Sequence, residues 1–295
     1  MRVAFLGLGA IGTPMARHLA KPPFALTVWN RTAAKAHAFA AAHGCAVAAT
    51  PADAARAADI VITCLPSSRE VEQVMMAADG LLDALVPGTL MVDCTSGDPA
   101  TSRRLATLLA ARGIHFLDAP VSGGTAGAEA ATLTVMVGGD AADFARVHDV
   151  LDAFGEKLVH CGPVGAGHAL KSVNNALLAI HIWSTAEGLA ALKKAGVDPA
   201  LALDVINASS GRSNASMNLF PQRVLTRAFP RTFRLALLDK DVGIAAQVAR
   251  DTATSAPLLQ LTAELFRAAH TLLGEDADHV EAAKLVERWA ATEIS

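Results

Sequence analysis

The chain has 295 residues, of which 52% are hydrophobic and 4% aromatic, and its formal net charge is −3. This length suits one large domain or two of ordinary size. Because acidic and basic residues are interspersed, the chain has neither the basic surface of a nucleic-acid-binding protein nor a polybasic membrane patch. It contains no tyrosine, which excludes every mechanism that uses a tyrosine proton donor.

Cysteine spacing and the N-terminus bear on where the protein works. The four cysteines are far apart and form no C-x-x-C pair, so we expect reduced core residues and no metal site. Met1 and Arg2 before the apolar Val3–Ala16 resemble a secretory signal in charge, but Pro14 and the glycines argue against one. No run approaches the ~20 apolar residues of a membrane span. We therefore expect a cytoplasmic protein with no membrane partner.

A glycine-rich loop follows the first apolar segment. Val3–Leu6 predicts a short buried strand, and a helical pattern ending at Leu19 begins a few residues later. The loop between them consists of Gly7, Leu8, Gly9, Ala10, Ile11 and Gly12. In this context G-x-G-x-x-G is the dinucleotide-binding pattern: its glycines permit a tight turn, the approach of a pyrophosphate and close helix packing. The alternative is a glycine-rich turn in some other βα unit.

The residues after the second strand indicate which dinucleotide is bound. The strand predicted at Ala25–Trp29 ends in Asn30, Arg31 and Thr32. NAD-binding units usually carry Asp or Glu here for the ribose 2′-hydroxyl, and this chain carries a cation and neutral hydrogen-bonding groups instead. We therefore expect NADP in preference to NAD. The alternative is that Arg31 is only a solvated residue in the first turn of the next helix.

Strands and helices continue to alternate up to about residue 162. Apolar segments predict strands at Ile60–Cys64, Thr89–Val92, His115–Leu117, Leu133–Val137 and Leu158–His160. Such alternation predicts a doubly wound, mostly parallel sheet of the Rossmann type, whose ligands bind at the carboxyl ends of the strands. Leu65 with Pro66, Thr95, and Ser122 with Gly123 and Gly124 follow three of these ends. Each could instead be a turn or a helix cap.

The second half of the chain predicts helices only. A long apolar helix spans about 165–195, and within it Lys171 and Asn175 project from one face because they lie four residues apart. The alternative is a lysine that extends to solvent and asparagines that join helices. We expect a Rossmann domain at 1–162 and a helical substrate and dimerisation domain at 163–295, with the long helix placing Lys171 at a cleft.

Four motifs in this order resemble those of the β-hydroxyacid dehydrogenase family, most closely its NADP-dependent 3-hydroxyisobutyrate dehydrogenases. The motifs are the glycine loop with Thr13–Ala16, then Asp118–Gly124, then Gly165-x-Gly167-x-x-x-Lys171-x-x-Asn174-Asn175, then Lys240-Asp241. The resemblance covers essentially the whole chain. Ile11 departs from the pattern, since many relatives carry Met there.

The resemblance implies roles for individual residues. Lys171 would be the catalytic acid/base, and Asn175 would bind substrate beside it. Ser122, Gly123 and Gly124 would bind the substrate carboxylate. Leu65, Pro66, Thr95 and Lys240 would line the nicotinamide end of the cofactor site.

The implied function is reversible hydride transfer between NADP and the carbinol carbon of a short 3-hydroxy acid, such as 3-hydroxyisobutyrate to methylmalonate semialdehyde. One alternative is a semialdehyde reductase acting on tartronate, succinic or glyoxylate-type substrates. Another is a non-catalytic NADP-binding protein, because a fold does not guarantee chemistry. Family members are dimers or tetramers, so we also expect a homo-oligomer.

Overall fold

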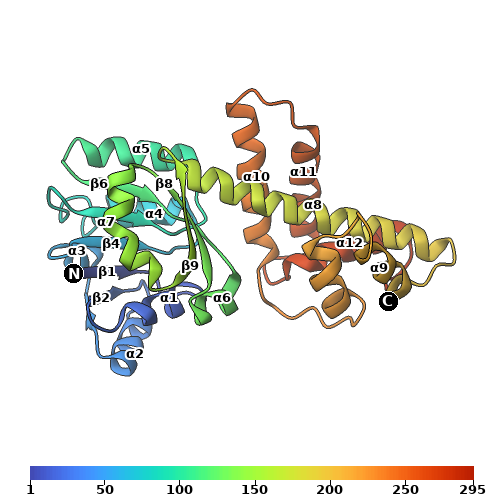
Figure 1. The fold of residues 1–295 in the computed structure, drawn as a ribbon, viewed down its shortest axis with the longest axis horizontal. Coiled ribbons are helices and arrows are strands. Elements are labelled where there is room, and N and C mark those ends of the chain that lie inside the picture. The colour runs from blue at the N-terminus through green and yellow to red at the C-terminus, as the bar shows by residue number, and fades with distance from the viewer. The chain divides into compact units, whose positions relative to one another are not determined.

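The apolar segments of the first half form one nine-stranded sheet in the computed structural model, which describes residues 1–295 (Figure 1). The strand order is β3-β2-β1-β4-β5-β6-β8-β7, and β9 also pairs with β8. The strands are β1 Arg2–Leu6, β2 Ala25–Trp29, β3 Ala46–Val47, β4 Ile60–Thr63, β5 Leu90–Asp93, β6 His115–Asp118, β7 Val121–Ser122, β8 Leu133–Gly138 and β9 Gly155–Gly162. Only the pairs of β8 with β6 and β7 are antiparallel, which confirms the predicted mostly parallel sheet.

Helices cover both faces of this sheet. In β1, Val3 and Phe5 join one apolar cluster, whereas Ala4 and Leu6 join the other. The first cluster is completed by α1 (Gly12–Leu19), α2 (Ala33–His43), α6 (Gly124–Ala130) and α7 (Ala141–Asp152). The second is completed by α3 (Pro51–Ala55), α4 (Ser68–Met76) and α5 (Pro99–Ala110). Burial on both faces explains why the strands read as continuous apolar runs.

Capping residues set where several helices begin. The Asp98 carboxylate accepts hydrogen bonds from the backbone N–H groups of Ala100 and Thr101 at the start of α5. At α4 the spacing of Ser67 and Glu70 predicts a reciprocal capping box. The structure differs: Ser67 caps Arg69 N, but its hydroxyl donates to Glu70 Oε2 at 2.6 Å. Glu70 therefore accepts from the Ser67 side chain and not from its backbone.

Residues after Gly162 form helices. These are α8 (Ala166–Lys194), α9 (Pro199–Asn207), a π-helix η1 (Ala215–Val224), α10 (Leu235–Asp251), α11 (Pro257–Leu273), a short 3-10 helix η2 (His279–Ala282) and α12 (Ala283–Ala290). The only β pairing is the isolated bridge of Arg234 with Asp278. This confirms the predicted all-helical second domain. None of the helices is both long and apolar enough to cross a membrane.

The sequence analysis does not predict the π-helix η1, which contains Pro221. Proline has no N–H and clashes with the carbonyl four residues earlier. The wider π turn pairs residues five apart, as in the bond from Leu225 N to Phe220 O of 3.0 Å. The Ser213 hydroxyl supports the start by accepting from Ser216 N at 3.1 Å.

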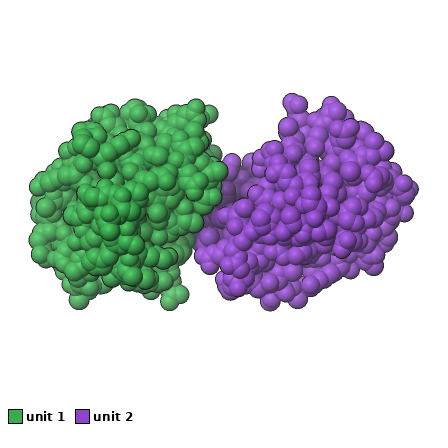
Figure 2. All heavy atoms as spheres, turned by 90° about the horizontal axis from the view of Figure 1, so that it is seen from below, with its two compact units in different colours: residues 1–171 green, residues 172–295 purple.

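The chain divides into two compact units, residues 1–171 and 172–295 (Figure 2). The sequence places the boundary at 162/163, where strands give way to helices. The first turns of α8 belong instead to the first unit, and one reason is that Gly165 N and His168 N donate to the Asp118 carboxylate at the end of β6. In the second unit Trp183 packs against Phe266 and Trp289, with ring centroids 6.0 and 5.5 Å away.

Candidate active site

The glycine loop after β1 has the geometry of a phosphate-binding turn. Gly7 has φ +109°, and a Cβ there would lie 2.3 Å from Cys64 O. A Cβ at Gly12 would lie 2.0 Å from Gly7 O, so α1 can pack against the loop only because residue 12 is glycine. A Cβ at Gly9 would meet nothing within 4 Å. Protein packing does not require Gly9, and its open side fits the close approach of a dinucleotide pyrophosphate.

Asn30 holds the glycine loop against the end of β2. Its Oδ1 accepts a hydrogen bond from Leu8 N at 2.9 Å, and its Nδ2 donates to Thr32 O at 3.1 Å. The neighbouring Arg31 and Thr32 are exposed, and the Thr32 side chain makes no capping hydrogen bond to α2. A cation, a hydroxyl and an uncapped helix N-terminus therefore lie where an acidic residue would stand in an NAD-binding unit.

Leu65 and Thr95 are brought together by hydrogen bonds at the ends of β4 and β5. Leu65 N donates to Thr95 Oγ1 at 3.1 Å. Thr95 N and the Thr63 hydroxyl both donate to Asp93 Oδ1, at 3.1 and 2.8 Å. The sequence does not single out Asp93, although its place at a strand end next to Thr95 is a usable signal. This carboxylate fixes the backbone that carries Thr95 and the adjoining Leu65–Pro66 turn.

Ser122, Gly123 and Gly124 form a turn between β7 and α6. Gly123 and Gly124 have φ of +137° and +65° and are exposed. Ser122, at the end of β7, is partly exposed. Successive amides in such left-handed turns form a concavity suited to an anion.

Lys171 lies in the second turn of α8 and is 8% exposed. This burial disagrees with the alternative of a lysine that extends to solvent. Asn175, four residues on, is 5% exposed and lies on the same side of α8. The helix therefore presents a buried lysine side chain and a buried amide one turn apart.

In the second unit Asn175 belongs to a cluster around Asp241 of α10. Asn175 Nδ2 donates to Asp241 Oδ2 at 2.6 Å, and Lys240 Nζ lies 3.0 Å from Asp241 Oδ1. Asn174 Nδ2 donates to Asn175 Oδ1 at 3.2 Å. One carboxylate thus orients both predicted site residues of this unit, Asn175 and Lys240. Asn175 also joins two helices, as the structural alternative expects.

The sequence did not single out His168, which lies in the first turn of α8. Its Nε2 lies 2.8 Å from Thr95 O, and its Nδ1 lies 2.7 Å from the Ser102 hydroxyl of α5. The usable signal is a titratable residue three positions before Lys171 in an otherwise apolar helix. Asp118 lies close by, and burial raises the pKa of its carboxyl group against the lowering effects of His168 and of three backbone N–H donors.

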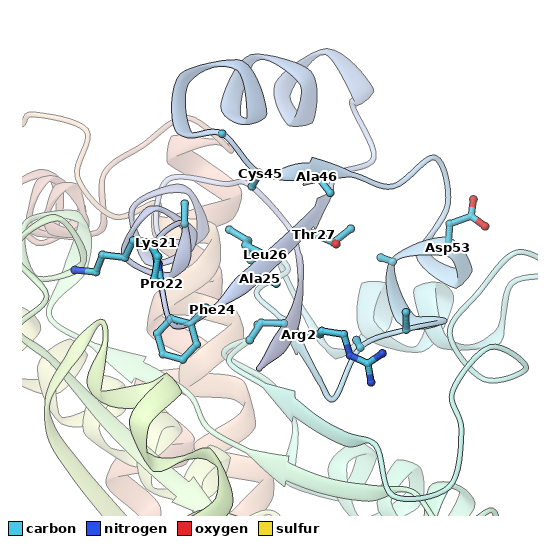
Figure 3. Close-up of a pocket in the computed structure, with 16 residues that line it drawn as sticks. Arg2, Lys21, Pro22, Phe24, Ala25, Leu26, Thr27, Cys45, Ala46 and Asp53 are labelled. Atoms are coloured by element: carbon cyan, nitrogen blue, oxygen red, sulfur yellow. The ribbon is translucent and has the colours of Figure 1, made fainter.

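A cavity of about 490 Å³ lies at the amino ends of β1 and β2 (Figure 3). Arg2, Lys21, Phe24 and Cys45 are among its lining residues, and it opens beside the first residues of β1 and β2. Ligands of doubly wound sheets bind at the carboxyl ends of the strands. The predicted site residues of the first unit other than Lys171 follow those ends, and none of them lines this cavity. No group of His, Cys, Asp or Glu side chains suits a metal ion.

Comparison with known proteins agrees with this geometry. Residues 2–162 match the model of the NAD binding domain of 6-phosphogluconate dehydrogenase. Residues 165–286 match the NAD-binding domain of NADP-dependent 3-hydroxyisobutyrate dehydrogenase. Both halves of the chain therefore match domains of pyridine-nucleotide dehydrogenases.

Two relatives and one solved structure cover nearly the whole chain. The 3-hydroxyisobutyrate dehydrogenase of Pseudomonas aeruginosa is 38% identical, with 90% of each chain covered. The NAD-dependent L-serine dehydrogenase of the same organism is 37% identical, with 90% of this chain and 91% of the relative covered. The structure of Mycobacterium tuberculosis 3-hydroxyisobutyrate dehydrogenase with L-serine has a TM-score of 0.88 at 33% identity, covering 97% and 98% of the chains.

A Rossmann-type dinucleotide-binding unit followed by a helical unit defines a pyridine-nucleotide oxidoreductase. The chain belongs to the β-hydroxyacid dehydrogenase family of NAD(P)-dependent enzymes, which includes 3-hydroxyisobutyrate dehydrogenase.

Proposed function

We propose that the protein catalyses reversible hydride transfer between NADP and the carbinol carbon of a short 3-hydroxy acid, with 3-hydroxyisobutyrate as the first candidate. The observation that carries this proposal is Lys171, a buried lysine one helical turn from Asn175 in a family of hydroxyacid dehydrogenases. The two relatives described above also support the substrate class, since 3-hydroxyisobutyrate and L-serine are both short 3-hydroxy acids.

Each predicted site residue has a defined task in this reaction. The nicotinamide supplies the hydride acceptor or donor, and the protein orients the substrate and moves the hydroxyl proton. The turn at Ser122–Gly124 binds the substrate carboxylate through its amides and the serine hydroxyl. In the oxidation direction the neutral amine of Lys171 accepts the hydroxyl proton, and Asn175 orients that hydroxyl. Lys240, Thr95 and the Leu65–Pro66 turn line the nicotinamide.

The NADP preference is supported by Arg31 and Thr32 at the N-terminus of α2. A 2′-phosphate is a dianion that gains from a guanidinium group, a hydroxyl group and uncapped amides. The NAD dependence of the L-serine dehydrogenase makes NAD the competing cofactor. The two cofactors therefore need to be compared on this chain directly.

Three other functions are distinguished by a substrate panel. A semialdehyde reductase would reduce tartronate, succinic or glyoxylate-type substrates faster than it oxidises any hydroxy acid. A phosphorylated sugar acid such as 6-phosphogluconate should be turned over poorly, because its dianion calls for several cations, and no cluster of lysines and arginines adjoins Ser122–Gly124 in the sequence. A non-catalytic NADP-binding protein would turn over none of these compounds.

The deciding experiment measures absorbance of the reduced nicotinamide with this panel and both cofactors. We expect turnover of 3-hydroxyisobutyrate or a close homologue with NADP. Ser122→Ala should raise the KM for the hydroxy acid and leave the KM for NADP almost unchanged. Equal turnover of an alcohol without a carboxyl group would contradict the role of Ser122–Gly124. If no panel member were turned over, the proposal that the protein is an enzyme of this class would be wrong.

We further propose that the protein works as a homodimer or homotetramer in the cytoplasm, without nucleic-acid or membrane partners. Exposed leucine and valine side chains on the helical unit support self-association, including Leu201 and Val205 of α9 and Leu258 and Leu261 of α11. The cytoplasmic location is supported by the wide spacing of the four cysteines in the sequence, which is atypical of a disulfide-rich secreted protein. If light scattering at micromolar concentration showed a monomer, the proposed homo-oligomer would be wrong.

A further inference from the structure

Asp118 acts as a remote cap for helix α8. Its side chain is fully buried at the end of β6, and its two oxygens accept from Gly165 N at 2.6 Å and His168 N at 2.8 Å. These amides lie just before and within the first turn of α8, where four N–H groups have no partner inside the helix. A carboxylate at a helix N-terminus is also favoured by the helix dipole. Asp118 therefore fixes where α8 begins relative to the sheet.

Glycines allow this close approach. A Cβ at Gly138 would lie 2.5 Å from Asp118 Oδ1. A Cβ at Gly167 would lie 2.2 Å from Met136 O and 2.9 Å from Asp118 Oδ2. The backbone of α8 thus lies directly against β8 and the Asp118 carboxylate. This contact fixes the distance of the first turn from the sheet, and a second contact is needed to fix its rotation.

The His168 ring supplies that second contact. It is 1% exposed and makes one hydrogen bond to the end of β5 and another to α5. A backbone carbonyl can only accept, so Nε2 carries the proton and donates to Thr95 O at 2.8 Å. Nδ1 lies 2.7 Å from the Ser102 hydroxyl oxygen, which also lies 3.2 Å from Asp98 O. The ring also packs on Gly97, where a Cβ would lie 2.7 Å from its Cε1.

We propose that His168 is a positioning residue that sets the rotation of the first turn of α8 and thereby aims Lys171. Lys171 follows three residues later, on the same side of the helix. Thr95 takes part in two contacts, because its carbonyl accepts from His168 and its hydroxyl accepts from Leu65 N. One residue at the end of β5 thus connects the predicted nicotinamide contacts to the helix that carries the lysine. The inference rests on the function proposed above.

The test compares His168→Leu with His168→Gln. Leucine keeps apolar bulk and removes both hydrogen bonds, whereas the amide N–H of glutamine can still donate to the Thr95 carbonyl. We expect His168→Leu to lower kcat about tenfold or more, since a small misplacement of a catalytic group is costly. The NADP dissociation constant should stay within about twofold of the wild-type value, and His168→Gln should restore kcat to within about threefold, because the remaining hydrogen bond keeps the helix aimed.

His160→Leu is the matched control. Its Nε2 also donates to a backbone carbonyl, Gly139 O at 2.8 Å, but its ring is exposed and stacks on Phe144 of α7. We expect kcat to be unchanged in this variant. If His168→Leu retained wild-type kcat, or if His168→Gln were as impaired as His168→Leu, the positioning role would be wrong. Should His168→Leu fail to fold, Ser102→Ala removes one of the two contacts, and an unchanged kcat there would contradict the proposal.

A second measurement separates this inference from the proposed function. Amide hydrogen exchange over residues 163–171 reports the anchoring of α8 without any substrate. We expect faster exchange in His168→Leu than in the wild type, and no change in His160→Leu or His168→Gln. If no hydroxy acid were turned over but exchange behaved in this way, the proposed function would fail while the anchoring role of His168 stood. Unchanged exchange in His168→Leu would overturn the anchoring role.

Discussion

Asp118 of the first unit and Asp241 of the second are 0% and 2% exposed, yet they are held by different kinds of partner. Asp118 accepts from two backbone amides at the start of α8. Asp241 contacts two side chains, those of Asn175 and Lys240. The first arrangement depends on how closely main chains approach, and the second depends on which side chains are present. Substitutions should therefore act differently in the two units.

Glycines show the same contrast. Around Asp118, a Cβ at Gly138 or Gly167 would overlap backbone or carboxylate atoms. In the second unit, a Cβ at Gly188 of α8 or Gly243 of α10 would meet nothing within 4 Å. Helix α8 contains glycines of both kinds, Gly167 near its start and Gly188 near its end. Replacing each of these two glycines of α8 by alanine can therefore test the contrast between the two units.

Gly167→Ala should destabilise the protein by about 3 kcal/mol or more, because its Cβ would overlap Met136 O and force the backbone apart. Gly188→Ala should stabilise it by up to about 1 kcal/mol, since alanine is favoured over glycine in a helix interior. Urea unfolding of the full chain measures both. A loss of stability in Gly188→Ala, or none in Gly167→Ala, would contradict the tight contact at the start of α8.

Lys171→Ala should lower kcat by about 10²-fold, or about 2.7 kcal/mol, the usual scale for removing a general acid/base. NADP binding should be largely intact, because the glycine loop and Arg31 do not involve this side chain. Steady-state kinetics and cofactor fluorescence separate the two effects. If the activity of the variant were within a few-fold of the wild-type value, Lys171 would not be the catalytic acid/base.

Much of the fold and of the candidate site can be predicted from the sequence, because some structural features require recognisable residue patterns. The two-faced sheet follows from uninterrupted apolar runs such as Val3–Leu6, and the glycine loop is recognisable by its place between strand and helix. Asp118 and Asp241 stand in the family motifs, but what they and His168 contact is harder to infer, since each bonds a residue 47 to 73 positions away in the sequence. The π-helix is also not readable from the sequence, since Pro221 interrupts the pattern of an α-helix and only the structure shows the wider turn.

Arg31→Ala should reduce kcat/KM with NADP by about tenfold, which corresponds to about 1.4 kcal/mol. With NAD we expect little change, because a ribose 2′-hydroxyl does not need a cation. The ratio of the two kcat/KM values is the relevant measurement. An equal loss with both cofactors would show that Arg31 does not select the 2′-phosphate, and would remove the reason for preferring NADP.

The smallest expected effect concerns His270 of α11, which is held by side chains alone. Its Nδ1 lies 2.9 Å from Asp239 Oδ2 and its Nε2 lies 3.1 Å from Glu275 Oε1. Partial burial lowers the pKa of His270, but the hydrogen bonds to Asp239 and Glu275 outweigh it, so the net pKa is raised. Folding then favours the protonated ring. The stabilisation is fully present below the unfolded pKa of about 6.5 and is lost as the pH rises through the folded value.

His270→Gln should therefore destabilise the protein at pH 6 by about 0.5–1 kcal/mol, the range of partly exposed ion pairs. At pH 9, where the wild-type ring is also neutral, the difference in unfolding free energy between variant and wild type should become smaller. His37→Gln, at an exposed position on α2, is the control and should show no such change with pH. Urea unfolding at the two pH values gives the result. A difference that grew with pH would mean that the neutral ring, and not the imidazolium bridging Asp239 and Glu275, stabilises this unit.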